Sequence, residues 1–433
     1  MSLCQALARS TCLPALLFAG AASAWQLDYS LEAALGHSDN INQSATDPVA
    51  QSILIPRIDF DFKEEGAALE ARAIGQVEYR DYLGNAFSNE VRGQLAGIAT
   101  WMILPHRLNF DIEDYVAVQP VNILAPNSPG NQQQTNVFTL GPTFNFRLWQ
   151  TLNGQAELRF TNSTASETKQ FNSDRGMAAL RAIRQLNPTD ALSGNIQAQH
   201  VHFTDRTGGP DYDRVDGFLR YQSKLSELDL DVAAGYSTLD LSGVGDHSGP
   251  MAHAIATWRA TPRNTLKVGA VRQFSDASQD MIIDPAALVA TMLGTGVVVG
   301  TTTVNSDVYL EKRFDASHVF QTERWQTRIA PYHKTLDYLI DPGLEQRIHG
   351  VVAGVSYRPR PLWTIAFDAT EETRDYPRLD RRDEDLRYDL SFLDQLARHW
   401  SVRVDLIRNE RNSTAPDQGF RENVFFCTLI FRR

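Results

Sequence analysis

Glu90 to Ile103 reads EVRGQLAGIATWMI, and small or apolar residues occupy every second position from Val91 onward. Glu90, Arg92 and Gln94 begin the set of positions between them. Successive side chains of a β-strand point to opposite faces, so this stretch predicts a strand with one apolar and one polar face.

The same alternation recurs along the whole chain, for example in RLNFDIED (107–114), WTIAFDATEE (363–372) and WSVRVDLIR (400–408). No run of about 20 apolar residues exists that could span a bilayer as a helix. We find no linker and no change of composition that would divide the chain. Short turns alternate with longer polar loops, as they do in outer-membrane barrels. The longer loops are expected at 37–50, 116–134, 162–173, 204–213, 241–249, 277–302, 374–383 and 411–419. The pattern therefore predicts an all-β protein, a transmembrane antiparallel up-and-down β-barrel of about 18–20 strands, with residues 25–433 as one domain.

The N-terminal residues predict a route across the inner membrane. Arg9 precedes an apolar core at 12–22, and small residues at 22–24 form a cleavage motif before Trp25. This pattern is typical of a secretory signal peptide, so we expect residues 1–24 to be removed. The barrel should then reside in the outer membrane of a Gram-negative envelope. Cys427 is the one cysteine outside the signal, which excludes an intrachain disulfide in the mature chain.

Net charge argues against a nucleic-acid partner. The chain carries 41 basic and 52 acidic residues. Arg9 is the one charged residue of the signal peptide, so removal of the peptide leaves 40 basic residues and a net charge of −12. Nucleic-acid binding requires a basic surface.

The seven tryptophans provide an independent test of the strand assignment. In the predicted arrangement each lies in the short-turn half of its strand. Tryptophan prefers the membrane interface, where the ring is apolar and the N–H stays hydrated. A soluble β-sandwich would explain the alternation, but it would not explain this sorting. The tryptophans are Trp25, Trp101, Trp149, Trp258, Trp325, Trp363 and Trp400.

Charged residues recur on one face of the predicted strands. An Arg or Lys that faces lipid costs about 2–4 kcal/mol at the bilayer midplane, so we expect these side chains to face the lumen. A barrel of this size is too wide for its own side chains to fill it, so the lumen should contain water. The charges either pair across strands and brace the wall, or select a hydrated, sugar-based solute, and both roles remain open. The predicted pore-lining residues are Arg92, Arg107, Asp111, Glu113, Glu157, Arg159, Arg214, Arg220, Asp307, Glu311, Arg313, Arg324, Arg328, Asp368, Arg387, Asp389, Arg403 and Asp405.

One predicted loop, 277–302, differs from the others because it contains an apolar stretch from Asp284 to Gly300. Asp284 can cap a helix that has Pro285 in its first turn. Apolar side chains of this kind gain by burial, so the stretch either folds into the barrel mouth as a gate or packs over the rim or on a partner. The residues expected to act in gating are Asp284, Pro285, Leu288, Met292, Leu293 and Val298.

No pattern in the sequence predicts a metal site, a cofactor or catalysis. The Asp- and Asn-rich stretch at 34–48 lacks the later glycine and the bidentate glutamate that a calcium loop needs at set spacing, so we interpret it as the exit from the first strand. His200 and His202 share one strand face, but a third metal ligand is not evident. A convergent Ser/His or paired-carboxylate site is also missing. We therefore expect the protein not to be an enzyme, with an outer-membrane enzyme acting on lipid or glycan as an alternative.

Four short stretches resemble the outer-membrane β-barrel porin family associated with exopolysaccharide export and biosynthesis systems. They are GHSDNIN (36–42), SILIPRIDFDF (52–62), VEYRDYL (77–83) and REN (421–423). The resemblance implies secretion of an extracellular polysaccharide through a charged, water-filled lumen, with polysaccharide export proteins of the periplasm or outer membrane as partners. The apolar face of the last strand, from Phe425 to Phe431, is typical of barrels handled by the outer-membrane assembly machinery. A general porin or an oligosaccharide-uptake porin is the alternative.

Overall fold

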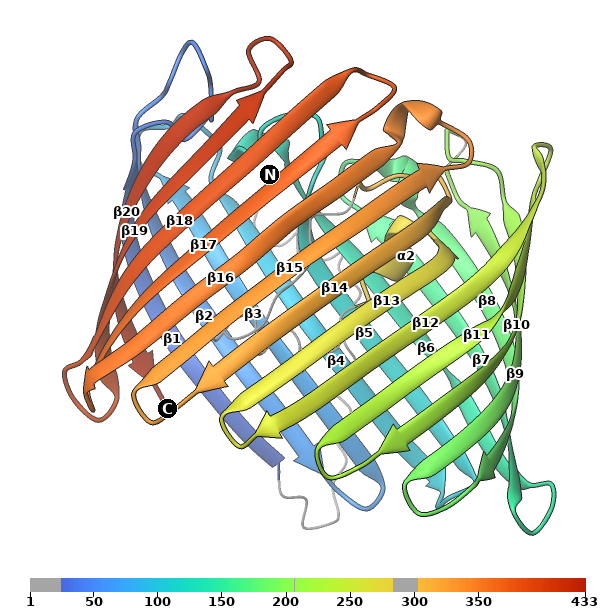
Figure 1. The fold of residues 1–433 in the computed structure, drawn as a ribbon. Helices are drawn as coiled ribbons and strands as arrows, with labels where there is room; N and C mark the ends of the chain where they lie inside the picture. Colours follow the sequence, from blue (N-terminus) through green and yellow to red (C-terminus); the bar gives the residue numbers. More distant parts are fainter. Residues whose placement is uncertain (1–24, 206, 283–302) are drawn as a thin grey trace.

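The computed structural model describes residues 25–205, 207–282 and 303–433, and these residues form one closed antiparallel sheet (Figure 1). Each strand pairs with the next in sequence, and β1 pairs with β20. The strands are β1 (Trp25–Ser38), β2 (Gln51–Glu65), β3 (Leu69–Tyr82), β4 (Glu90–Leu104), β5 (Leu108–Pro120), β6 (Gln132–Arg147), β7 (Leu152–Ala165), β8 (Ser173–Gln185), β9 (Asp190–Phe203), β10 (Tyr212–Lys224), β11 (Leu228–Leu241), β12 (Gly245–Thr261), β13 (Asn264–Ser275), β14 (Tyr309–Gln321), β15 (Trp325–Tyr338), β16 (Gln346–Arg360), β17 (Trp363–Tyr376), β18 (Arg381–Gln395), β19 (Trp400–Ser413) and β20 (Phe420–Arg432). The predicted fold is confirmed, with a strand number at the upper end of the expected range.

The sheet closes by pairing the two ends of the chain. Ser30 of β1 lies opposite Arg432 of β20, and the ladder continues to Ser38 opposite Val424. A closed barrel leaves no strand edge, so every strand can satisfy its main-chain hydrogen bonds inside a bilayer.

The two ends of the barrel differ in the length of their connections. Nine short turns, among them 66–68, 262–263 and 361–362, lie at one end together with Arg432, and longer connections such as 39–50 lie at the other (Figure 1). In outer-membrane barrels the short turns face the periplasm. The long-loop end is therefore extracellular.

Several expected loops are shorter than the sequence suggested, and those at 116–134 and 241–249 are two examples. The expected loop at 116–134 is reduced to 121–131, because β5 extends to Pro120 and β6 begins at Gln132. The expected loop at 241–249 is a three-residue turn, 242–244. Gly243 and Gly245 adopt positive φ there, a conformation that glycine takes without a steric cost.

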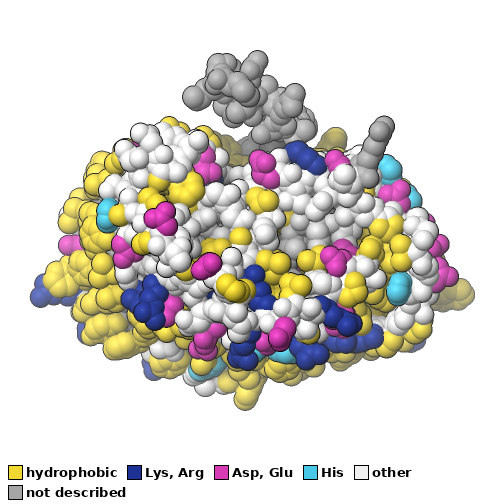
Figure 2. All heavy atoms as spheres, turned by 90° about the horizontal axis from the view of Figure 1, so that it is seen from above, with side chains coloured by type: hydrophobic (Ala, Val, Ile, Leu, Met, Phe, Trp, Pro, Cys, Tyr) yellow, Lys and Arg dark blue, Asp and Glu magenta, His cyan; other side chains and the backbone are white. Residues whose placement is uncertain are grey.

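The outer surface of the barrel is apolar. Val91 is 65% exposed and Leu406 is 52% exposed, whereas the neighbouring Asp405 is 9% exposed and faces inward. Viewed from the long-loop end, apolar side chains gather along the outer margin and polar side chains occupy the middle (Figure 2). A closed barrel with this outer surface is an outer-membrane protein. No helix among the described residues is long and apolar enough to cross a membrane.

All seven tryptophans lie at the short-turn end, as predicted. Trp25, Trp325, Trp363 and Trp400 are the first residues of their strands, Trp149 lies in turn 148–151, and Trp101 and Trp258 lie within four residues of the end of β4 and β12. They form the aromatic belt that is expected at the periplasmic interface.

Candidate pore lumen

A cavity of about 800 Å³ lies inside the barrel, against β1–β3 and β14–β20. Among the described residues, its lining includes seven arginines and five carboxylates, and Phe426 is the one aromatic residue. The charged residues of this lumenal cavity are Arg57, Arg80, Arg328, Arg358, Arg387, Arg403, Arg432, Glu32, Glu78, Asp368, Asp389 and Asp405. The cavity thus has two more positive than negative side chains, although the protein as a whole is acidic.

Each of the five carboxylates in the lumenal cavity pairs with an arginine. The shortest N···O separations are 2.7 Å for Arg80–Glu78, 3.0 Å for Arg403–Asp405, 3.3 Å for Arg328–Asp368 and 3.3 Å for Arg387–Asp389, and Glu32 binds Arg57. Within the described part of the chain, Arg358 and Arg432 take part in no ion pair. Their guanidinium groups therefore supply the excess positive charge of the cavity.

The structure places six of the predicted pore-lining residues in this cavity, namely Arg328, Asp368, Arg387, Asp389, Arg403 and Asp405. Nine others lie on strands but do not line this cavity: Arg92, Asp111, Glu113, Glu157, Arg159, Arg214, Arg220, Glu311 and Arg313. The remaining three lie outside the strands. Arg107 and Arg324 are exposed in short turns, and Asp307 lies in the connection that precedes β14. Alternation continues for a residue or two beyond a strand end, which is why the sequence pattern assigned these three to the wall.

Some of the predicted lumenal charges brace the wall. Arg159 on β7 lies 2.6 Å from Asp111 on β5 and 3.3 Å from Glu157, which also binds Arg181 on β8. Asp111 accepts a further hydrogen bond from Thr100 on β4. This network connects β4, β5, β7 and β8, which fits the structural alternative for these residues.

Helix α2 (Ala277–Asp280) lies within the ring of strands near the long-loop end (Figure 1). Asp276 accepts a hydrogen bond from the main-chain N–H of Gln279, and its carboxylate binds Arg175 and Tyr212 on the wall. Asp280 binds Lys334 at 2.6 Å. These contacts attach the start of the connection between β13 and β14 to the inside of the barrel.

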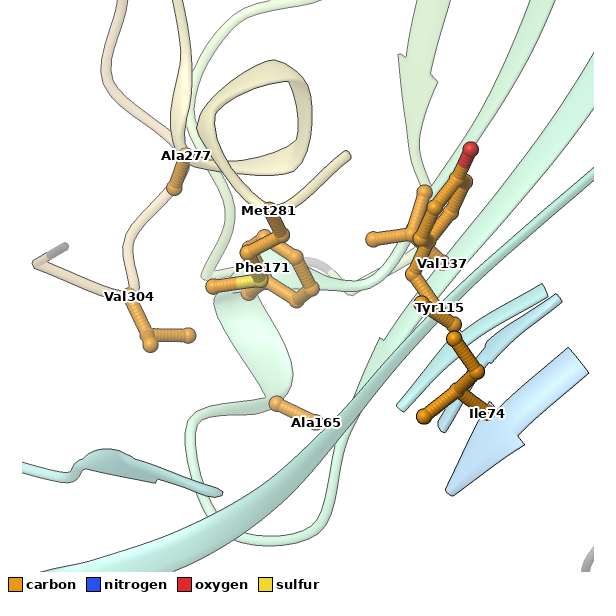
Figure 3. Close-up of a cluster of buried hydrophobic side chains, with 9 residues drawn as sticks. Ile74, Tyr115, Val137, Ala165, Phe171, Ala277, Met281 and Val304 are labelled. Carbon is orange, nitrogen blue, oxygen red and sulfur yellow. The ribbon is translucent and has the colours of Figure 1, made fainter. Parts of the chain in front are cut away.

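An apolar cluster supports the same segment. Met281, just after α2, packs near Phe171 and Val304, and the cluster continues to Tyr115 and Val137 on the wall (Figure 3). The predicted gating residues Asp284, Pro285, Leu288, Met292, Leu293 and Val298 lie outside the described residues. The part of their connection that is described folds into the lumen.

A second connection, loop 121–131 between β5 and β6, reaches the wall formed by β18 and β19. Arg411 on β19 donates to the main-chain oxygen of Ala125 at 3.2 Å, and Ile123 is 6% exposed. Within the loop lies η1 (Pro129–Asn131). The sequence pattern predicted a polar loop at 116–134 but not its packing against the wall, although the mainly apolar stretch VNILA (121–125) is a signal of the same kind as the one at 284–300.

The connections at the two barrel ends differ in charge. Among the described residues, those at the long-loop end contain twelve acids and two bases, and those at the short-turn end contain two acids and five bases. The acids at the long-loop end are Asp39, Asp47, Glu167, Asp205, Asp211, Asp276, Asp280, Asp307, Asp341, Glu345, Asp380 and Asp417, and the bases are Lys169 and Arg378. The charged residues at the short-turn end are Arg107, Arg263, Arg324, Arg398, Arg433, Glu227 and Glu323.

The two histidines that share a strand face lie near the extracellular end of β9. His200 is hydrogen-bonded to Asp213 and His202 to Asp211. Across the described residues, no group of three or more His, Cys, Asp or Glu side chains could hold a metal ion. In the stretch at 34–48, Asn40 bonds to the main chain of Ser44, as expected where a strand exits into a loop.

Six further charged residues of the lumenal cavity were not predicted from the sequence, namely Glu32, Arg57, Glu78, Arg80, Arg358 and Arg432. The signal was present for four of them, because they alternate with apolar residues in β1, β2 and β3. Arg358 and Arg432 lie close to strand ends, where alternation gives little information.

No protein-family model matches the chain, and no curated protein matches it. Among solved structures, the chain is similar to the ferric enterobactin receptor PfeA of Pseudomonas aeruginosa, at 9% identity and a TM-score of 0.47 over 96% of this chain and 81% of that chain. It is also similar to the siderophore receptor PirA of Pseudomonas aeruginosa, at 12% identity and a TM-score of 0.43 over 94% and 80% of the two chains. The FrpB iron transporter of Neisseria meningitidis matches at 7% identity and a TM-score of 0.42 over 94% and 81%. Values this low assign neither a family nor a solute.

Proposed function

We propose that the protein is an outer-membrane pore through which a hydrated extracellular polysaccharide leaves the cell. The observation that carries the proposal is the charged lumenal cavity inside a closed barrel of twenty strands. Side chains of both signs keep such a lumen wet, and a wet lumen suits a solute that retains its hydration shell. Transport then needs no cofactor and no catalytic step.

The outward direction and the polysaccharide rest on the resemblance of four short sequence stretches to the export-associated porin family. Polysaccharide export proteins of the periplasm or outer membrane are the partners that this role requires. They would deliver the polymer to the short-turn end, where the periplasmic turns lie.

Two measurements test the proposal. Purified protein in planar bilayers should form channels with a stable conductance. Deletion of the gene should lower the polysaccharide released by the cells and retain polymer in the periplasm, and the intact gene should restore release. Normal release by the deletion strain, or a barrel that does not conduct, would overturn the proposal.

A further inference from the structure

Charge is distributed unequally along the axis of the pore. From this we propose that the solute is an acidic polysaccharide, one that carries carboxylate or sulfate groups, and that the barrel captures it at the short-turn end. The inference rests on the proposed function and adds the chemical class of the solute and its side of entry.

The arginines of the lumenal cavity differ in whether they have an ion-pair partner. Every carboxylate there is already paired, whereas Arg358 and Arg432 have no ion-pair partner among the described residues. A guanidinium group binds a carboxylate or a sulfate through two parallel N–H donors. These two side chains are therefore available to a solute in a way that the paired arginines are not.

These two arginines lie near the short-turn end of the barrel. Arg358 is the third residue from the end of β16, and Arg432 is the last residue of β20. Both strands run toward the short-turn end, and both side chains line the lumenal cavity. The free positive charge thus lies where a polymer from the periplasm would enter.

Aromatic rings are scarce in the described lining of the lumenal cavity. A neutral sugar offers CH faces that stack on flat aromatic surfaces, and Phe426 is the one aromatic side chain that the described residues contribute to the lumenal cavity. A cavity with seven arginines and one aromatic ring recognises charge better than it recognises a neutral sugar face.

The connections at the two barrel ends also have opposite net charge. Three of the twelve acids at the long-loop end are neutralised, because Asp276 binds Arg175, Asp280 binds Lys334 and Glu345 binds Arg378. The other nine form no ion pair with a lysine or arginine within the described chain. They repel a polyanion that approaches from outside, while the bases at the short-turn end attract one from the periplasm. A passive pore determines only how fast the polymer is captured from each side. Synthesis of the polymer drives its net outward flux.

The test uses the full mature protein in planar bilayers. The probes are an oligomer of galacturonate, which is acidic, and a dextran oligomer of similar length, which is neutral. Each probe is added to one side at a time, and the rate at which it blocks the current is measured. Orientation follows from the side on which a bulky thiol reagent alters the current of an Asp417→Cys variant in a Cys427→Ser background.

The critical variant is the double substitution Arg358→Gln and Arg432→Gln. Arg263→Gln is its matched control, because Arg263 lies in a turn at the same end and does not line the lumenal cavity. We expect the acidic oligomer to block roughly tenfold faster from the short-turn side than from the long-loop side at low salt. The double variant should lose most of this difference, and the control should keep it.

The dextran result and the conductance separate the inference from the proposed function. A conducting barrel that the acidic oligomer blocks equally from both sides, or that keeps its asymmetry in the double variant, overturns the inference alone. Faster block by dextran than by the acidic oligomer also overturns it. A barrel that does not conduct overturns both.

Discussion

The guanidinium group of Arg381 on β18 donates a hydrogen bond of 2.5 Å to the main-chain oxygen of Leu124, which lies 257 positions earlier in the chain. This bond holds loop 121–131 of β5 and β6 against a part of the wall formed by the last strands. Arg411 holds the next residue, Ala125, in the same way. The loop therefore projects over the lumen, and its attachment can be tested.

We expect Arg381→Ala to raise the single-channel conductance. A hydrogen bond to a charged group contributes about 1.5–3 kcal/mol, and its loss frees one anchor of loop 121–131. The control is Arg378→Ala, because Arg378 is exposed in the same extracellular region and, among the described residues, its side chain pairs with Glu345 alone. Equal conductance in both variants and the wild type would show that the loop does not narrow the pore.

Loss of the Arg175 side chain should destabilise the barrel far more than loss of an exposed cation. Arg175 and Asp276 are both buried, so Arg175→Ala leaves a buried carboxylate unpaired, at a cost of about 3–5 kcal/mol. Lys312→Ala removes an exposed pair with Asp337, which is worth at most about 1 kcal/mol. The temperature at which the folded band disappears in heat-modifiable gel migration measures both effects. A similar shift in the two variants would contradict the anchoring role of Asp276.

The facing of β19 can be checked by thiol labelling. We expect a water-soluble reagent to reach Arg403→Cys faster than Val402→Cys, each in a Cys427→Ser background, because Arg403 lines the lumenal cavity and Val402 is on the opposite face. Faster labelling of Val402→Cys would mean that the register is shifted by one residue, since such a shift exchanges the two faces of a strand.

The connection before β14 should respond to pH. Burial raises the pKa of Asp307 from 3.8 to about 6, although its carboxylate accepts the main-chain N–H of Asp341 at 2.8 Å. At a pH between these two pKa values, the folded state therefore binds more protons than the unfolded state. The stabilisation is fully present below about pH 4 and is lost as the pH rises through about 6.

Hydrogen exchange of residues 303–308, corrected for its intrinsic pH dependence, should show faster local opening at pH 7 than at pH 5. Asp307→Asn should remove this difference, because the amide cannot ionise. Persistence of the difference in the variant would assign the pH effect to another group.

Much of the fold could be predicted because strand facing is a local property. Val91 and Arg92 point to opposite faces whatever the rest of the chain does, and the cost of a charge in lipid then determines which face is lumenal. The position of Trp101 near a strand end likewise follows from neighbouring residues. The candidate site was harder to predict from the sequence. Alternation places a charge on the lumenal face, but it does not show which strand lies opposite.

Loop 121–131 shows why contacts between distant segments could not be predicted from the sequence. Its apolar residues show that it must pack against something, but the identity of its partners, Arg381 and Arg411, depends on the position of β18 and β19 around the ring. No local pattern carries that information.

The sequence by itself determined that the chain forms strands with one apolar and one charged face, that the tryptophans lie at one end, and that the charges avoid lipid. Only the tertiary structure decided which charges meet. Glu32 near the start of the chain lies 3.7 Å from Arg403 near its end, because β1 closes the ring against β20. A ring of strands brings distant segments together through its closure, so the pairing of the arginines, and with it the free charge of Arg358 and Arg432, follows from the register of the whole barrel.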